Sequence, residues 1–278
     1  VNQEGVGKLS IDAAPYIEQV FVRLKDNLFA PELLERKVFA LRKYTTNLIR
    51  KEIPHTEDEF YLSSMSYKTI VYKGQLTTAQ LRSYFLDLND EHVTSAIALV
   101  HSRFSTNTFP KWKLAQPFDY IAHNGEINTI RGNVNNMKAK EALMSSPFFS
   151  NEELARMSPI CDLRRSDSSN LDSIIEMLVF GGRSLPHAMM MLIPEAWQED
   201  VDMPEYKRAF YSYHASFMEP WDGPASIPFT DGNVIGALLD RNGLRPSRYT
   251  LTKSGFVIMS SEIGVLDIDP EDVIQHGR

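Results

Sequence analysis

The sequence predicts an α+β protein in which antiparallel sheets stack on one another and the helices lie outside them. Three observations support this class. Several long stretches repeat apolar residues at the spacing of an α-helix. Two strong hairpin signals follow one another near the end of the chain. Helices and strands are therefore largely segregated along the sequence, which is typical of α+β proteins.

The first long helix is expected over residues 31–53. Leu34 and Val38 lie at helical spacing, and Pro31 suits the first turn because a backbone N–H there has no partner to lose. Pro54 ends the segment. Four further helices follow the same reasoning, the first of them with threonine hydroxyls that can cap it. They are expected over residues 77–88, 132–144, 166–181 and 204–217.

Short apolar runs bounded by turn residues predict the strands. In the first half of the chain they are expected over residues 60–62, 69–72, 96–104 and 118–123. In the last quarter they are expected over residues 225–229, 234–239, 249–252 and 256–259. Asp231-Gly232 separates the first pair of this second group, and a Lys-Ser-Gly turn separates the second pair. Each pair is therefore expected to form a hairpin.

Composition excludes several classes of function. The chain has 278 residues, a net charge of −7, one cysteine and no linker-like tract, so one domain spanning residues 1–278 is expected. The acidic balance argues against a nucleic-acid partner, which needs an excess of Lys and Arg. The sequence has no apolar run of the roughly 20 residues that cross a bilayer, so no membrane partner is expected. A single cysteine favours a reducing, cytoplasmic location.

Two expected strands end in polar blocks that carry chemistry. The block at residues 101–110 reads HSRFSTNTFP, and the block at residues 123–128 reads HNGEIN. The first offers Arg103 beside hydroxyl groups, and the second offers the amide of Asn124 beside the unobstructed backbone N–H of Gly125. Together they can hold a carboxylate at one end of a small molecule and a developing oxyanion at the other.

These blocks resemble the class II, N-terminal-nucleophile glutamine amidotransferases, and more narrowly the amidotransferase part of glutamate synthase large subunits. The resemblance covers nearly the whole chain in the family's order. It rests on residues 101–110, 123–137, 166–172, 218–224 and 240–246. It implies a four-layer α/β/β/α sandwich of the Ntn-hydrolase type, which here is expected to be incomplete.

The resemblance also implies roles for five residues. Arg103 and Thr106 match positions that bind the carboxylate of the substrate, and Asp167 matches the position that binds its α-ammonium group. Asn124 and Gly125 match the donors that stabilise the tetrahedral oxyanion. Taken alone, Arg103 could instead pair with a surface acid, Asn124-Gly125 could be an ordinary turn, and Asp167 could simply favour a helix N-terminus. No metal site is expected.

The family's nucleophile is an N-terminal cysteine, whereas this chain begins with Val1. Cys161 is internal and has no histidine near it in sequence, so it is expected to be structural. We therefore interpret the chain as the larger, C-terminal part of an amidotransferase domain that lacks its nucleophile segment. Alone, it is expected to be inactive and to associate with itself through exposed apolar surface.

The function implied is hydrolysis of L-glutamine to glutamate and ammonia, which a synthase domain of the same parent chain would use to aminate 2-oxoglutarate reductively. No cofactor is expected on this chain. The resemblance assigns flavin mononucleotide and an iron–sulfur cluster to other parts of the parent, with electrons from ferredoxin or from a pyridine-nucleotide-oxidising small subunit. Two alternatives stay open: a non-catalytic fragment that binds glutamine or glutamate, and the amidotransferase domain of another class II enzyme.

Overall fold

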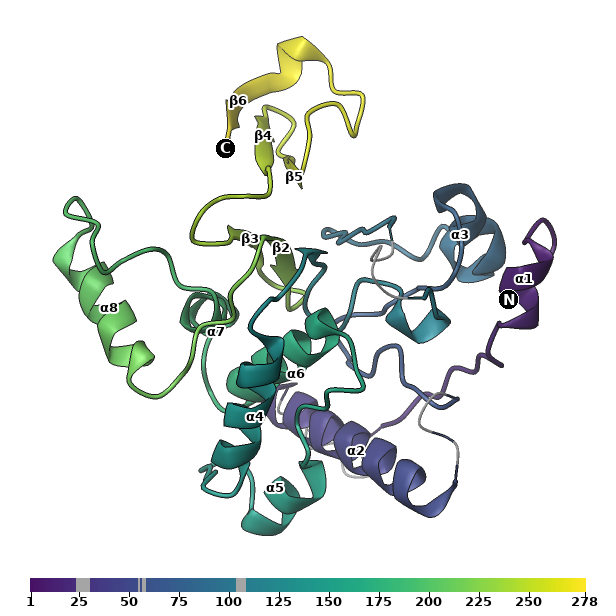
Figure 1. Cartoon of the computed structure of the whole chain (residues 1–278). Coiled ribbons are helices and arrows are strands. Elements are labelled where there is room, and N and C mark those ends of the chain that lie inside the picture. Colours follow the sequence, from purple (N-terminus) through teal and green to yellow (C-terminus); the bar gives the residue numbers. More distant parts are fainter. Residues whose placement is uncertain (24–30, 55, 57–58, 104–108) are drawn as a thin grey trace.

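Figure 1 shows the computed structural model, with β4, β5 and β6 at the top, helices α2, α4, α5 and α6 in the lower part, α8 on the left, and α1 and α3 on the right. The structure describes residues 1–23, 31–54, 56, 59–103 and 109–278. Within these residues the helices are α1 (Lys8–Asp12), α2 (Pro31–Glu52), α3 (Thr78–Tyr84), α4 (Ile130–Glu141), α5 (Asn151–Met157), α6 (Asp167–Phe180), α7 (Leu185–Leu192) and α8 (Glu205–Ala215). The strands are β1 (Asn124–Gly125), β2 (Ala225–Thr230), β3 (Ile235–Leu239), β4 (Arg248–Thr252), β5 (Val257–Ser260) and β6 (Val273–Gly277).

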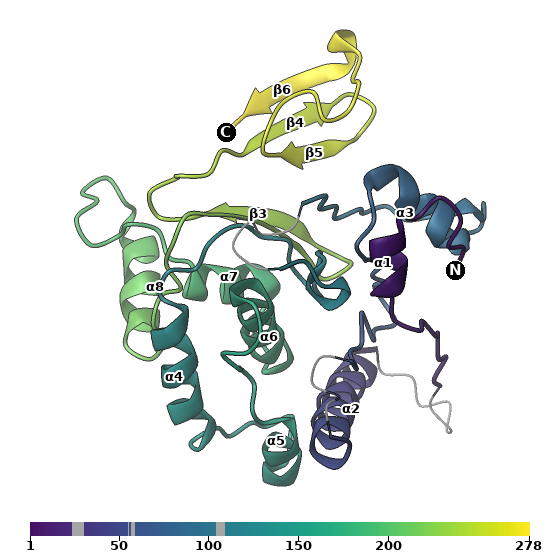
Figure 2. The same cartoon turned by 45° about the vertical axis from the view of Figure 1, so that its right-hand side comes forward.

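The strands form two antiparallel sheets of three strands each. In the first sheet β2 lies between β1 and β3, with Ser226 opposite both Asn124 and Leu239. In the second sheet β4 lies between β5 and β6. Both expected hairpins, β2–β3 and β4–β5, are confirmed. Both views place α4, α6 and α7 on one side of the first sheet and the second sheet on the other (Figures 1 and 2).

Helix α6 is the centre of the core. Its apolar side chains Leu171, Ile174 and Ile175 are buried, and they belong to one cluster with Ile227 of β2 and with side chains of α7. Most α6 residues are buried, polar ones included, so this helix has almost no solvent face. Polar groups near its N-terminus therefore need protein partners, and they find them at the edge of the first sheet.

Several expectations about elements were wrong. The structure shows no strand at residues 60–62 or 69–72, nor at the described residues of the 96–104 run. The run at residues 118–123 is partly confirmed, since Ile121 bridges to Phe229 just before β1. Helices α1, α5 and α7 and strand β6 were not expected. The remaining long helices are confirmed within a few residues at each end.

The α+β class is confirmed by the helices and antiparallel sheets. The views show no helix over the outer face of the β4–β5–β6 sheet within the described residues (Figure 2). No helix in this part of the chain is long and apolar enough to cross a bilayer.

Candidate active site

The edge strand β1 presents three N–H groups on the side opposite β2. Ala122 and Glu126 donate their N–H groups to carbonyls of the 224–228 segment, at 3.0 and 2.9 Å. N–H groups alternate between the two sides of an antiparallel strand. The N–H groups of His123, Gly125 and Ile127 therefore point away from the sheet.

Two of these three groups are held by side chains. The N–H of His123 donates to Oε1 of Gln116 at 2.6 Å, and the N–H of Ile127 donates to Oδ2 of Asp167 at 2.8 Å. The N–H of Gly125 lies between them and has no acceptor within the described residues. Among the three N–H groups, that of Gly125 is therefore the one available to a ligand, and Gly125 is a residue expected in the oxyanion hole.

Asp167 is the first residue of α6, and its carboxylate turns back to this edge. Ser166 caps the helix by accepting the N–H of Ser169 at 3.1 Å, and the positive end of the helix dipole favours an acid in this turn. The bond from Ile127 places the carboxylate two residues along the strand from Gly125, roughly 7 Å at strand spacing. The structure therefore brings the predicted ammonium acceptor beside the predicted oxyanion donor.

Gly125 cannot be replaced without moving its surroundings. Its φ is +153°, and a Cβ on it would lie 1.8 Å from the carbonyl oxygen of Pro224 and 2.9 Å from Nε2 of His123. Gly223 faces the same strand with φ of +152°, and its Cβ would lie 1.9 Å from the carbonyl oxygen of Glu126. Two glycines thus let the chain segments approach closely where the N–H must be aimed.

Of the other three predicted site residues, Asn124 and Arg103 have fewer contacts that locate them. Asn124 is next to Gly125 with its side chain exposed, so its amide is accessible to a ligand. Arg103 is also exposed, and its carbonyl accepts a hydrogen bond from the ring of His101. Thr106 lies outside the described residues.

Several charged side chains act on the pKa of His123. Burial lowers the pKa of His123, the Asp167 carboxylate opposes this shift, and the charges of His101 and Arg245 lower the pKa further. His101 is two residues from Arg103 in the sequence, and Arg245 belongs to the 240–246 block. The sequence had suggested no role for Arg245.

Asp172 fixes the chain segment that leads into the site, a function that sequence reasoning missed. Its buried carboxylate accepts the backbone N–H groups of Asp119, Tyr120 and Ile121 at 3.2, 2.9 and 3.1 Å. The sequence did contain a signal for this role. Asp172 lies within the apolar stripe of the expected 166–181 helix, and an acid that is buried there needs hydrogen-bond partners. Two acids of α6, Asp167 and Asp172, therefore hold the two ends of one segment.

A buried ion network ties α2 to this arrangement. Arg42 pairs with both Asp119 and Glu176, and Nζ of Lys43 lies 3.1 Å from Glu176. Burial, followed by the positive charge of Arg42, lowers the pKa of Lys43 to about 7. The network holds the carboxylate of Asp119, whereas Asp172 holds its backbone N–H.

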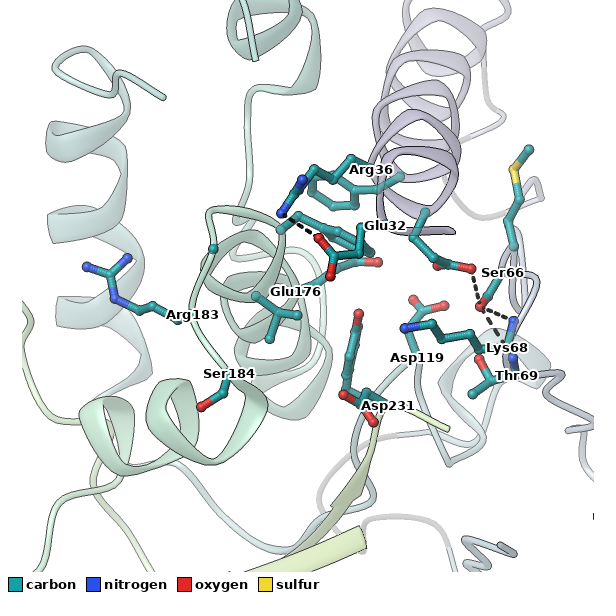
Figure 3. A pocket seen from close by; sticks show the side chains of 17 residues that line it. Glu32, Arg36, Ser66, Lys68, Thr69, Asp119, Glu176, Arg183, Ser184 and Asp231 are labelled. Atoms are coloured by element: carbon teal, nitrogen blue, oxygen red, sulfur yellow. Dashed lines mark hydrogen bonds and ion pairs between the residues drawn. The ribbon is translucent and has the colours of Figure 1, made fainter. Parts of the chain in front are cut away.

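A cavity of about 330 Å³ lies toward the C-terminal part of α6, away from Asp167 (Figure 3). Three of the acids that line it have partners within the protein. Asp119 and Glu176 pair with Arg42, whereas Glu35 accepts hydrogen bonds from the Ser66 hydroxyl at 2.9 Å and from a backbone N–H at 2.7 Å. None of the four predicted site residues that the structure describes (Arg103, Asn124, Gly125 and Asp167) lines this cavity.

Cys161 is confirmed as structural. It is fully buried, and burial raises the pKa of its thiol to about 12, so it is protonated at neutral pH and cannot act as a thiolate nucleophile. No group of three or more His, Cys, Asp or Glu side chains in the described ranges could hold a metal ion.

A sequence model described as glutamine amidotransferases class-II matches residues 1–278. The chain belongs to this family. The amidotransferase chain is 50% identical over 283 residues to a glutamate synthase [NADPH] large chain of Bacillus subtilis, and 49% identical over 279 residues to a glutamate synthase [NADH] of Schizosaccharomyces pombe. It is 44% identical over 278 residues to a ferredoxin-dependent glutamate synthase of Pyropia yezoensis.

These alignments cover 98–100% of the amidotransferase chain but only 13–18% of each relative. The similarity to glutamate synthases confirms the narrower resemblance. The three relatives name three different electron donors, so the similarity does not single out one of them.

Proposed function

We propose that this amidotransferase domain hydrolyses L-glutamine to glutamate and ammonia for a glutamate synthase. The observation that supports this function best is the N–H of Gly125, which has no acceptor among the described residues and lies between two N–H groups that side chains hold. A fixed, unpaired donor at a sheet edge is suited to the oxyanion of a tetrahedral intermediate. The Asp167 carboxylate beside it suits the ammonium group of an amino acid.

In this proposal each predicted residue keeps one role. Asn124 and Gly125 donate to the oxyanion formed on the side-chain amide of glutamine. Asp167 binds the α-ammonium group, and Arg103 binds the α-carboxylate through two parallel charge-assisted bonds, with the hydroxyl of Thr106 as a further donor. The exposure of Arg103, which leaves its guanidinium accessible to a ligand, supports this assignment.

The nucleophile belongs to a longer chain in this proposal. An N-terminal cysteine there attacks the amide carbon, its own amino group accepts the thiol proton, and loss of ammonia leaves a thioester that water hydrolyses. The segment that carries this cysteine would also complete the four-layer sandwich. The burial of Cys161 supports a nucleophile from elsewhere.

The parent protein we propose is a cytoplasmic glutamate synthase. Its synthase domain would receive the ammonia and aminate 2-oxoglutarate, with flavin mononucleotide and an iron–sulfur cluster held outside these 278 residues. A small subunit that oxidises a pyridine nucleotide, or ferredoxin, would supply electrons. The names of the relatives support this proposal.

Glutamine hydrolysis by the full-length protein tests the site. We expect Arg103→Ala and Asp167→Asn to raise KM for glutamine about 10- to 100-fold, because each removes a charged hydrogen bond to the substrate. Arg156→Ala is the matched control, since this arginine is exposed on α5 and pairs with Glu152. Unchanged KM in both site variants would refute the assignment, and absence of hydrolysis by the wild type would refute the function.

A further inference from the structure

His123 is buried between the strand edge and α6. Only 3% of its surface is exposed, and its Nδ1 lies 2.8 Å from the hydroxyl oxygen of Ser168. Ser168 is buried too, and it follows Asp167 in the first turn of α6. Its N–H donates to Oδ1 of Asp167 at 2.6 Å, and its hydroxyl lies 3.1 Å from the same oxygen. One hydrogen-bonded chain therefore runs from the imidazole to the carboxylate.

The opposite side of the imidazole lies against Gly125. The point where a Cβ of Gly125 would stand is 2.9 Å from Nε2 of His123 and 1.8 Å from the carbonyl oxygen of Pro224. The ring thus occupies the space that a side chain at residue 125 would need. Nε2 is buried and faces the backbone of Pro224, which raises the pKa of the ring, whereas Nδ1 contacts the hydroxyl of Ser168.

We propose that His123 and Ser168 are positioning residues that set the Gly125 N–H at a fixed distance from the Asp167 carboxylate. This inference rests on the proposed function, because it assigns the first group to the oxyanion and the second to the ammonium of glutamine. Neither residue touches the substrate. Their effect is to keep the two ends of the site at the separation that one glutamine molecule requires.

The carboxylate is fixed from both sides, which makes the bridge effective. Asp167 accepts the Ile127 N–H with one oxygen and the Ser168 N–H with the other. Loss of the imidazole leaves the Ile127 contact intact, so the substrate's ammonium site survives. The Gly125 N–H alone loses its support, and that donor is needed most in the transition state.

Steady-state hydrolysis of glutamine by the full-length protein tests this inference in four variants. We expect His123→Leu to lower kcat about 10- to 100-fold with KM changed less than about 3-fold, since a misplacement of about 1 Å at a reacting centre can cost 10²-fold. His123→Asn should recover much of kcat, because an asparagine places an amide atom near the position of Nδ1. Ser168→Ala should resemble His123→Leu.

The double variant His123→Leu/Ser168→Ala gives the decisive comparison. Two residues that act through one shared hydrogen bond are not additive, so we expect the double variant to lose no more kcat than the more affected single variant. Ser173→Ala is the matched control. This serine is buried on the same helix but contacts Arg165 and Lys43, and we expect kcat near that of the wild type.

If the kcat losses of the two single variants multiply in the double variant, the proposed role of His123 and Ser168 is refuted. Equal kcat in His123→Asn and His123→Leu would also refute it. A wild type that does not hydrolyse glutamine would instead overturn the proposed function. Circular dichroism melting of each variant identifies any that does not fold. If His123→Leu does not fold, the inference is decided by His123→Asn and Ser168→Ala, where unchanged kcat in Ser168→Ala would refute it.

Discussion

Gly125 is constrained at the residue scale by backbone on one side and by an imidazole on the other. We expect Gly125→Ala to destabilise the fold by about 2 kcal/mol or more, because it combines a positive φ with a contact that cannot relax cheaply. The same variant should lose glutamine hydrolysis in the full-length protein. Thermal unfolding and a glutaminase assay measure the two effects.

Gly132→Ala is a matched control for this prediction. A Cβ on Gly132 would meet nothing within 4 Å, and the residue lies in α4. Alanine is favoured over glycine within a helix by about 0.5–1 kcal/mol, so this variant should be as stable as the wild type or slightly more stable. Equal melting temperatures for the two variants would show that Gly125 is less constrained than the structure indicates.

The residues proposed to contact substrate could be predicted from the sequence better than the residues proposed to position them. Asn124, Gly125 and Asp167 stand in recognisable blocks, and the structure brings them to one strand edge. The bridge through His123 and Ser168 could not be predicted, because it depends on which side of the strand each group faces. That side follows from pairing with a segment about a hundred residues away.

At the scale of elements, the attachment of α6 to residues 119–121 should contribute strongly to stability. Asp172→Ala removes the acceptor of two buried N–H groups and one part-buried N–H group, and a buried donor without a partner costs about 1–3 kcal/mol. We expect a loss of about 3 kcal/mol in the free energy of unfolding, measured by urea denaturation. Glu152→Ala on exposed α5 should change it by less than about 0.5 kcal/mol. Similar losses in both would contradict the role of Asp172.

Local signals account for the elements that the sequence predicted correctly. Helices α2, α4, α6 and α8 follow apolar spacing, and both hairpins follow their turns. Helix α5 was missed although Ser150 and Glu153 form a capping box at its start. The strands expected at residues 60–62 and 69–72 were wrong because an apolar run becomes a strand only with a paired neighbour, and pairing is not a local property.

At the scale of the whole molecule, the second sheet and its loops expose apolar side chains. Phe256, Val257, Ile263, Leu266 and Ile274 are each more than half exposed. Soluble monomers rarely expose large contiguous apolar patches. We therefore expect the 278-residue chain, studied alone, to associate with itself as its concentration rises.

Light scattering across a concentration series measures this association. The variant Phe256→Ser/Ile274→Ser should shift association to higher concentration. Leu143→Ser should not, although Leu143 is 85% exposed, because it lies just after α4 and is not part of the second sheet. A monomer at all concentrations would show that the second sheet is not an association surface.

The row of three N–H groups beside β1 also determines how fast each exchanges its hydrogen with deuterated water. The amides of His123 and Ile127 are held by side chains and should exchange slowly, whereas the amide of Gly125 between them should exchange fast. Slowing of that one amide on addition of glutamine, resolved by NMR, would report an occupied oxyanion hole without any turnover. In that experiment the exchange rate of the Gly125 amide would report ligand binding, and the slowly exchanging amides of His123 and Ile127 would serve as internal references.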